Sequence, residues 1–223
     1  MLGADYLKSS TGSRSLIHIL DSGAGSGKPT VQHDLVATFK QSFQALSGHV
    51  HLAGNTEQVL HLIAKILAVH KARRIALAGL SQDLHAGIDG VCAAQSIEIL
   101  CPPFDAASAH RQIDTAEVGI TAALFAIAET STIAELATTD DIRMVSSLPR
   151  THISIVRVST LVSSLHDAAP LVREAFKASP AHCVVSFISG PSRTGDIELK
   201  LTLGVHGPET VHAILLDDAE TVS

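Results

Sequence analysis

Apolar positions along the chain follow two alternating periods. Between residues 33 and 46 they recur every three or four positions, which predicts an amphipathic helix with Gly48 as its C-terminal stop. A second wide apolar face follows Asn55, and Asn55 with Gln58 three residues later predicts a helix N-cap. Short aliphatic runs between these stripes predict strands at residues 49–52, 75–79, 97–100, 152–156, 184–189 and 211–216.

Two longer segments complete the pattern. Residues 120–128 are almost wholly apolar and end at the polar run 129–132. Residues 160–176 have helical spacing, and Ser159 or Thr160 is the predicted N-cap. Because strands alternate with helices and the turns between them are short, the sequence predicts an α/β fold with a mostly parallel sheet and helical crossovers.

Composition agrees with this fold, and it changes at one point along the chain. Hydrophobic residues make up 46% but aromatic residues only 3%, so the core is built from Ala, Val, Leu and Ile. Such a core suits parallel strands that are buried on both faces. Residues 1–32 are rich in Ser and Gly and predict a flexible N-terminal arm and linker. The composition does not change again, so residues 33–223 predict a single domain.

Charge and cysteine usage exclude several classes of protein. The formal net charge is -6 and no block of Lys and Arg is present, which argues against nucleic-acid binding. No apolar run reaches the length of about 18 residues that a membrane span needs, and the N-terminus lacks a secretory pattern. Cys92, Cys101 and Cys183 lie far apart and form no disulfide, zinc or iron–sulfur spacing. These features predict a reducing, cytoplasmic location.

Two near-matches to enzyme motifs fail on spacing. Residues 23–30 imitate a phosphate-binding P-loop, but the glycines stand one residue too close and Pro29 occupies a Ser/Thr position. Residues 190–194 resemble a G-x-S-x-G nucleophile elbow, but the second glycine is Gly195. The sequence therefore predicts neither a P-loop nucleotide site nor a serine hydrolase.

Glu129 is the first candidate for chemistry. It follows an apolar run, where desolvation raises the proton affinity of a carboxylate and makes it useful as an acid, base or nucleophile. The hydroxyls of Thr130, Ser131 and Thr132 are placed to orient it or to bind a ligand. The alternative is a structural glutamate that caps a helix or pairs with an arginine.

A polar segment at residues 189–198 is the second candidate. Gly190 permits a sharp turn or a close approach to a ligand, and Arg193 offers a planar donor set for carboxylate or phosphate. Ser192, Thr194 and Asp196 are helix N-cap types, and a helix N-terminus here would favour an anion. The alternative is an ordinary strand-to-helix turn with Arg193 in a structural ion pair.

The thirteen histidines do not form a recognisable metal motif. His49 and His51 would share one face of a strand, but no acid or cysteine stands beside them at ligand spacing. We therefore expect no metal site. His206 lies between Gly204 and Gly207 in a predicted turn, where it is either structural or directed at the candidate cleft.

Four ordered blocks give the chain a family resemblance, and they comprise residues 126–132, 147–153, 187–198 and 203–208. Together they resemble the LUD-domain family, strongly over residues 117–216 and loosely over 33–100. The resemblance implies a three-layer α/β/α fold of the NagB/RpiA/CoA-transferase-like kind. It also implies a role in oxidising L-lactate to pyruvate, beside partner subunits that carry iron–sulfur clusters. Where the family usually has glycine, this chain has Ser131, which is expected to narrow the pocket.

The leading hypothesis is a subunit of a lactate-oxidising system with a cleft for a small anion. Arg193 would hold the carboxylate or phosphate of the ligand, and electron transfer would occur in the partner subunits, because this chain lacks clustered cysteines. The candidate residues of the cleft are Glu129, Thr130, Ser131, Ser189, Gly190, Ser192, Arg193, Thr194, Asp196 and His206. One alternative is a self-contained isomerase or CoA transferase that uses Glu129, a role taken from related folds by analogy. Another is a non-catalytic scaffold or regulatory binding module.

Overall fold

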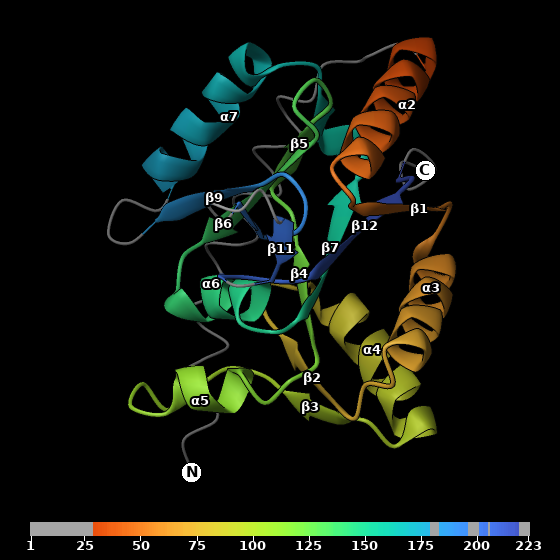
Figure 1. The fold of residues 1–223 in the computed structure, drawn as a ribbon. Helices are drawn as coiled ribbons and strands as arrows, with labels where there is room; N and C mark the ends of the chain where they lie inside the picture. Colours follow the sequence, from red (N-terminus) through yellow and green to blue (C-terminus); the bar gives the residue numbers. More distant parts are fainter. Residues whose placement is uncertain (1–28, 179–182, 196–200, 205, 219–223) are drawn as a thin grey trace.

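A six-stranded parallel sheet forms the centre of the computed structural model, which describes residues 29–178, 183–195, 201–204 and 206–218. Its strand order is β1-β12-β7-β4-β2-β3, and every neighbouring pair is parallel (Figure 1). The strands are β1 His49–Ala53, β2 Arg74–Leu77, β3 Glu98–Leu100, β4 Val118–Ala122, β7 Thr151–Arg157 and β12 Thr210–Leu216.

Helices cover both faces of this sheet, because side chains alternate between its faces along each strand. Ile75 and Leu77 of β2 face the core under α3 (Thr56–Val69) and α4 (Gln82–Gln95). Ala76 of β2 faces the other side, where α5 (Ala109–Ile113) and α6 (Asp140–Ser147) pack. Further along that side lies α2 (Pro29–Ala45), whose aromatic rings pack on β7 and β12. The predicted α/β fold with a mostly parallel sheet is confirmed.

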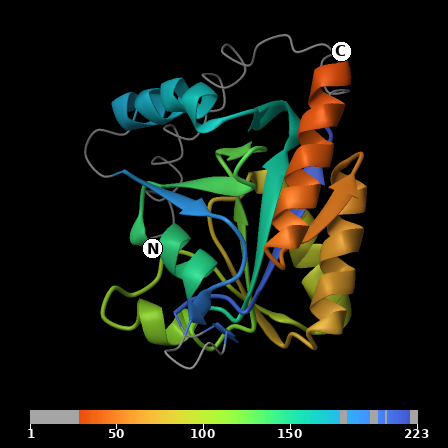
Figure 2. The same cartoon turned by 45° about the horizontal axis from the view of Figure 1, so that its top comes forward.

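A second sheet extends β4 and β7 beyond their carboxyl ends. Its order is β8-β5-β6-β9, in which β5 and β8 are parallel and the other pairs are antiparallel. Helix α7 (Leu165–Ala178) packs on this sheet through Ala168, and both ribbon views show it well apart from α2 (Figures 1 and 2). The strands are β5 Phe125–Ile127, β6 Thr132–Ala137, β8 Leu161–Val162 and β9 Val184–Ile188. A hairpin follows, made of β10 (Arg193–Gly195) and β11 (Leu201–Leu203).

Most predicted elements occur close to their predicted bounds, and Asn55 caps α3 by accepting from the Gln58 N–H. The prediction that Ser159 or Thr160 caps the helix that became α7 is wrong. Residues 158–160 form a short 3-10 helix, β8 follows, and α7 starts at Leu165. Ser164 caps it instead, because its hydroxyl accepts from the Asp167 N–H while the Asp167 carboxylate accepts from Ser164.

Two other boundaries differ from the pattern. The apolar run at residues 120–128 is divided between β4 and β5, since the chain passes there from one sheet to the other. Helix α2 begins at Pro29, inside the segment predicted as arm and linker, and proline is favoured at a first helical position. Residues 1–28 of the predicted arm lie outside the described residues. None of the described helices is both long and apolar enough to cross a membrane.

Candidate functional site

The β5–β6 turn carries the first group of predicted site residues. Glu129 and Thr130 are exposed on this turn, and the Glu129 N–H donates to the Ser163 carbonyl at 3.0 Å. Ser131 is buried and has φ +47°, a left-handed conformation that favours glycine. A glycine would adopt this backbone conformation with less strain than a serine. The Ser131 hydroxyl donates to the Thr130 carbonyl at 2.8 Å.

A chain of hydroxyls joins this turn to the second predicted segment. Thr130 Oγ1 lies 2.8 Å from Thr132 Oγ1, which in turn lies 2.7 Å from Ser189 Oγ. The antiparallel pairing of Ile133 with Ile188 places Thr132 and Ser189 opposite each other. Two sequence blocks 57 residues apart therefore meet through side chains that both donate and accept hydrogen bonds.

The loop after β9 is fastened to the end of α2. Gly190 has φ +102°, and a Cβ there would lie 3.2 Å from the Leu46 carbonyl oxygen. The exposed Arg193 side chain donates to that same carbonyl through one guanidinium nitrogen. A guanidinium carries five N–H groups, so this bond leaves others for a ligand. The loop thus brings Arg193 beside the end of α2.

The remaining predicted residues lie on adjoining loops. The Ser192 N–H donates to the Pro208 carbonyl at 2.9 Å, and the Ser192 carbonyl accepts from the Gly204 N–H at 3.0 Å. His206 is exposed in the loop that Ser192 contacts. Thr194 lies in β10 opposite Thr202. Asp196 lies outside the described residues.

Glu129 and Arg193 are held in place by bonds to different elements. The Glu129 N–H bonds to Ser163, which follows β8, whereas the Arg193 side chain bonds to Leu46, which follows α2. Among the ion pairs of the described residues, none joins the two side chains. The structure therefore brings together the hydroxyls of Thr130, Thr132 and Ser189, and a shared cleft for Glu129 and Arg193 stays a prediction.

A buried ionic cluster was missed by the sequence analysis. Glu135 of β6 and His152 of β7 have side chains that are 1% and 0% exposed, with Glu135 Oε1 and His152 Nε2 3.3 Å apart. Thr121 of β4 donates to Glu135 and lies 2.9 Å from His152. Burial alone raises the pKa of Glu135, but His152, Thr121 and Ser146 outweigh it and hold this pKa below its ordinary value. The only sequence signal was a single acid inside an apolar strand.

A second cluster joins histidines from three elements near the amino-terminal ends of the parallel strands. His51 Nε2 lies 3.0 Å from His212 Nδ1, and His70 Nε2 lies 3.2 Å from His212 Nε2. His70 Nδ1 lies 3.2 Å from Thr151 Oγ1, so the chain of contacts continues to β7. His49 stacks on His212 with ring centroids 4.7 Å apart.

Burial and mutual repulsion disfavour the protonated forms of His51, His70 and His212. Burial is the largest cause that lowers the pKa of His212, and with the charges of His49, His51, His70 and His152 when protonated it brings that pKa to about 3. Burial, and secondly His49, also lower the pKa values of His51 and His70. The rings stack or join in pairs instead of converging. Over the described ranges, no three His, Cys, Asp or Glu side chains are arranged to hold a metal ion.

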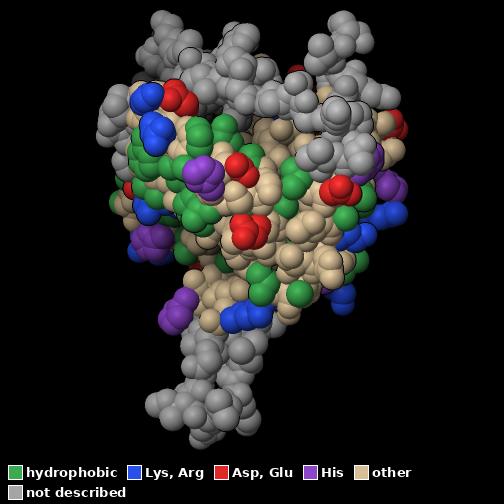
Figure 3. Space-filling model, turned by 90° about the horizontal axis from the view of Figure 1, so that it is seen from above, with side chains coloured by type: hydrophobic (Ala, Val, Ile, Leu, Met, Phe, Trp, Pro, Cys, Tyr) green, Lys and Arg blue, Asp and Glu red, His purple; other side chains and the backbone are tan. Residues whose placement is uncertain are grey.

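The described part of one face shows no extended basic patch. In Figure 3, basic side chains lie in small groups near the edges of the described surface, and acidic side chains lie nearer its middle, beside a group of hydrophobic side chains. Nucleic-acid binding needs several cations placed to neutralise successive phosphates.

A parallel sheet whose β4 and β7 continue into a second sheet, with polar loops at its margin, defines a three-layer α/β protein. The family model "LUD domain" matches residues 36–216, so the chain belongs to the LUD domain family. A solved DUF162 family protein from Deinococcus radiodurans superposes with a TM-score of 0.60 at 21% identity, over 83% of this chain and 98% of that one. At that identity the likeness shows the fold alone.

Curated relatives carry the name "Lactate utilization protein C". The protein from Shouchella clausii is 38% identical over 114 residues, which are 51% of this chain and 50% of the relative. The protein from Anoxybacillus flavithermus is 27% identical over 190 residues, covering 84% of this chain and 82% of that one. For most of the curated relatives that it matches, the chain spans about half of their length.

Proposed function

We propose that this LUD-domain chain is a cytoplasmic subunit of a lactate utilisation system and binds a small carboxylate beside the β5–β6 turn. The relatives named Lactate utilization protein C support the pathway. The observation that supports the place is the 2.7 Å contact between Thr132 and Ser189, which joins two of the sequence blocks that carry the family resemblance.

The proposed ligand is a 2-hydroxy acid such as L-lactate. Arg193 would receive its carboxylate through the guanidinium N–H groups that are not bonded to Leu46. The exposed hydroxyls of Thr130 and Ser189 would exchange hydrogen bonds with the 2-hydroxyl, because each can donate and accept. In this proposal Thr132 is a positioning residue that holds both of them.

Electron transfer is assigned to partner subunits that carry iron–sulfur clusters. The three cysteines of this chain stand in different surroundings: Cys92 is buried, Cys101 is exposed and Cys183 is intermediate. Iron–sulfur clusters need several convergent thiolates. The proposal therefore requires that this chain act only in the company of redox partners.

Growth on L-lactate tests this proposal in a strain that lacks the gene. Wild type and Arg193→Ala are reintroduced at equal levels, with Arg111→Ala as the matched control. Arg111 is also exposed and also donates to a backbone carbonyl, that of Ala107, but it lies in α5. We expect Arg193→Ala to fail on lactate while growing normally on glucose, and Arg111→Ala to grow on both. Full rescue by Arg193→Ala would contradict the proposal.

The exposure of Glu129 keeps the self-contained enzyme open as a second candidate. An acyl-transfer enzyme would form a covalent acyl-glutamate, which hydroxylamine or borohydride traps after treatment with acyl-CoA. Mass spectrometry then reports whether Glu129 is marked, and an unmodified Glu129 removes this candidate. A scaffold is the third candidate, and it predicts partner binding that survives loss of both Glu129 and Arg193.

A further inference from the structure

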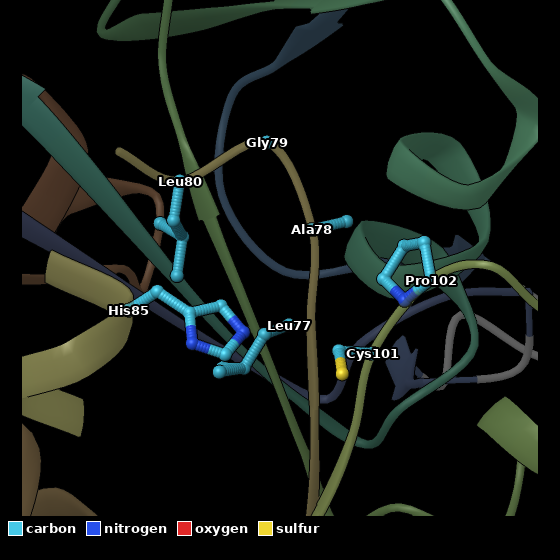
Figure 4. A pocket seen from close by; sticks show the side chains of 7 residues that line it. All are labelled: Leu77, Ala78, Gly79, Leu80, His85, Cys101 and Pro102. Carbon is cyan, nitrogen blue, oxygen red and sulfur yellow. The ribbon is translucent and has the colours of Figure 1, made fainter. Parts of the chain in front are cut away.

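A cavity of about 170 Å³ opens where strands β2 and β3 end. Its walls come from the turn at residues 77–80, from His85 in the second turn of α4, and from Cys101 and Pro102 after β3 (Figure 4). The carboxyl ends of parallel strands are the usual ligand edge of open α/β sheets. The volume lies below the roughly 300–1,000 Å³ of drug-sized sites, so only a small molecule fits.

The backbone places a thiol and an imidazole around this one space. Ala76 pairs with Leu100 across β2 and β3, so Cys101 follows directly beside the end of β2. Gly79 has φ +68° and turns the chain from β2 toward Ser81, which caps α4 by accepting from the Leu84 N–H. Helix α4 therefore begins at the rim, and its His85 reaches the cavity wall.

The thiol of Cys101 belongs to the most exposed of the three cysteines. Cys101 is exposed, whereas Cys92 is buried and Cys183 is intermediate. Burial, with Asp89 as a second cause, raises the pKa of Cys92 to about 11, and burial raises the pKa of Cys183. Both shifts favour the protonated thiol, which is the less reactive form.

Asp89 orients the imidazole of His85. His85 Nδ1 lies 3.2 Å from Asp89 Oδ2, one turn further along α4. A carboxylate that accepts from Nδ1–H fixes the tautomer in which Nε2 carries the lone pair. Thiol, imidazole and carboxylate are the three groups that an activated nucleophile needs: attacking group, base and orienting acid. Cys101 and His85 line the same cavity, and among the described residues no hydrogen bond joins them.

We propose that Cys101 is the nucleophile of a second site, with His85 as its base and Asp89 as a positioning residue, and that it takes a small aldehyde or ketone. The thiol adds reversibly across the carbonyl double bond. A sulfur–carbon bond forms, the carbon–oxygen double bond becomes single, and the thiol proton passes through His85 Nε2 to that oxygen. The addition consumes no oxidant and no second reactant, and it does not depend on the lactate role proposed above.

Alkylation of the full chain with iodoacetamide tests the base, with peptide mass spectrometry reporting each cysteine separately between pH 6 and 9. We expect Cys101 to react at least about tenfold more slowly at pH 7 in His85→Gln, a conservative figure for loss of a general base. Asp89→Asn leaves the imidazole in place and is expected to slow the reaction less. Cys183 should react alike in all three proteins, and an unlabelled Cys92 reports that each variant is folded.

Glyoxylate, a small aldehyde, tests the ligand class in the same assay. We expect millimolar glyoxylate to protect Cys101 of the wild type from iodoacetamide. Superimposable pH–rate curves for Cys101 in wild type, His85→Gln and Asp89→Asn would overturn the assigned base. Alkylation of Cys101 that is unaffected by glyoxylate would overturn the assigned ligand class.

Discussion

Acidification from pH 8 to pH 5 is expected to destabilise the fold through the buried His212. Its pKa is lowered to about 3 from an ordinary value of 6.5, so the unfolded chain binds a proton over this range that the folded chain does not. The stability that neutral His212 contributes is fully present above about pH 6.5 and is lost as the pH falls toward 3. The direction is therefore loss of stability with acid.

The size follows from the same shift. Each pH unit below the ordinary pKa costs about 1.4 kcal/mol, so His212 alone costs roughly 2 kcal/mol at pH 5. That is a large part of a typical free energy of unfolding of about 5–15 kcal/mol. The pKa values of His51 and His70 are lowered too, so these residues steepen the loss in the same direction.

Urea denaturation at pH 8, 7, 6 and 5 measures this free energy directly. His212→Gln keeps a side chain that donates and accepts but cannot be protonated, so its stability should fall less with acid by about 2 kcal/mol at pH 5. His61→Gln is the control, because His61 is exposed on α3 and should leave the pH slope unchanged. Equal slopes for wild type and His212→Gln would refute the reasoning.

Three further predictions concern the core and the site. Glu135→Gln or His152→Gln removes one member of a buried hydrogen-bonded cluster and leaves the other without its partner, so each should lower the free energy of unfolding by about 1–3 kcal/mol; an unchanged free energy of unfolding in urea would contradict this. Gly119→Ala puts a Cβ 1.9 Å from a backbone carbonyl oxygen of α6 and should cost about 1–3 kcal/mol or prevent folding, whereas Gly90→Ala meets nothing within 4 Å and should be neutral or stabilising. Equal melting temperatures for these two variants would count against the packing described. Thr132→Val removes the bridging hydroxyl. It should lower the free energy of unfolding by about 1 kcal/mol and abolish growth on lactate. Unaltered growth would contradict the role proposed for this hydroxyl in ligand binding.

Much of the fold was predictable because the strands of a parallel sheet are buried on both faces. Continuous aliphatic runs such as 75–77 leave little choice of structure, and Asn55 with Gln58 predicted the start of α3. The start of α7 was not predictable from propensity alone. Ser159, Thr160 and Ser164 are all suitable caps, and the choice depended on β8 pairing with β5 before the helix begins.

The site was predictable only in part. Sequence blocks pointed to Thr130 and Ser189, yet their connection through Thr132 depends on the register of β6 against β9. Glu135 and His152 lie in different strands, and no local sequence feature of either residue predicts that they pair. His212 meets His51 and His70 through strand pairing and the end of α3. Such contacts arise from tertiary packing, which periodicity does not record.

Isothermal titration of L-lactate into the purified chain tests the proposed binding site most directly, with Arg193→Ala and the control Arg111→Ala measured beside wild type. A lost hydrogen bond to a charged group is worth about 1.5–3 kcal/mol, so Arg193→Ala should bind roughly 10- to 100-fold more weakly while Arg111→Ala binds like wild type. Equal affinities for wild type and Arg193→Ala, or no heat of binding in any of the three, would contradict the account.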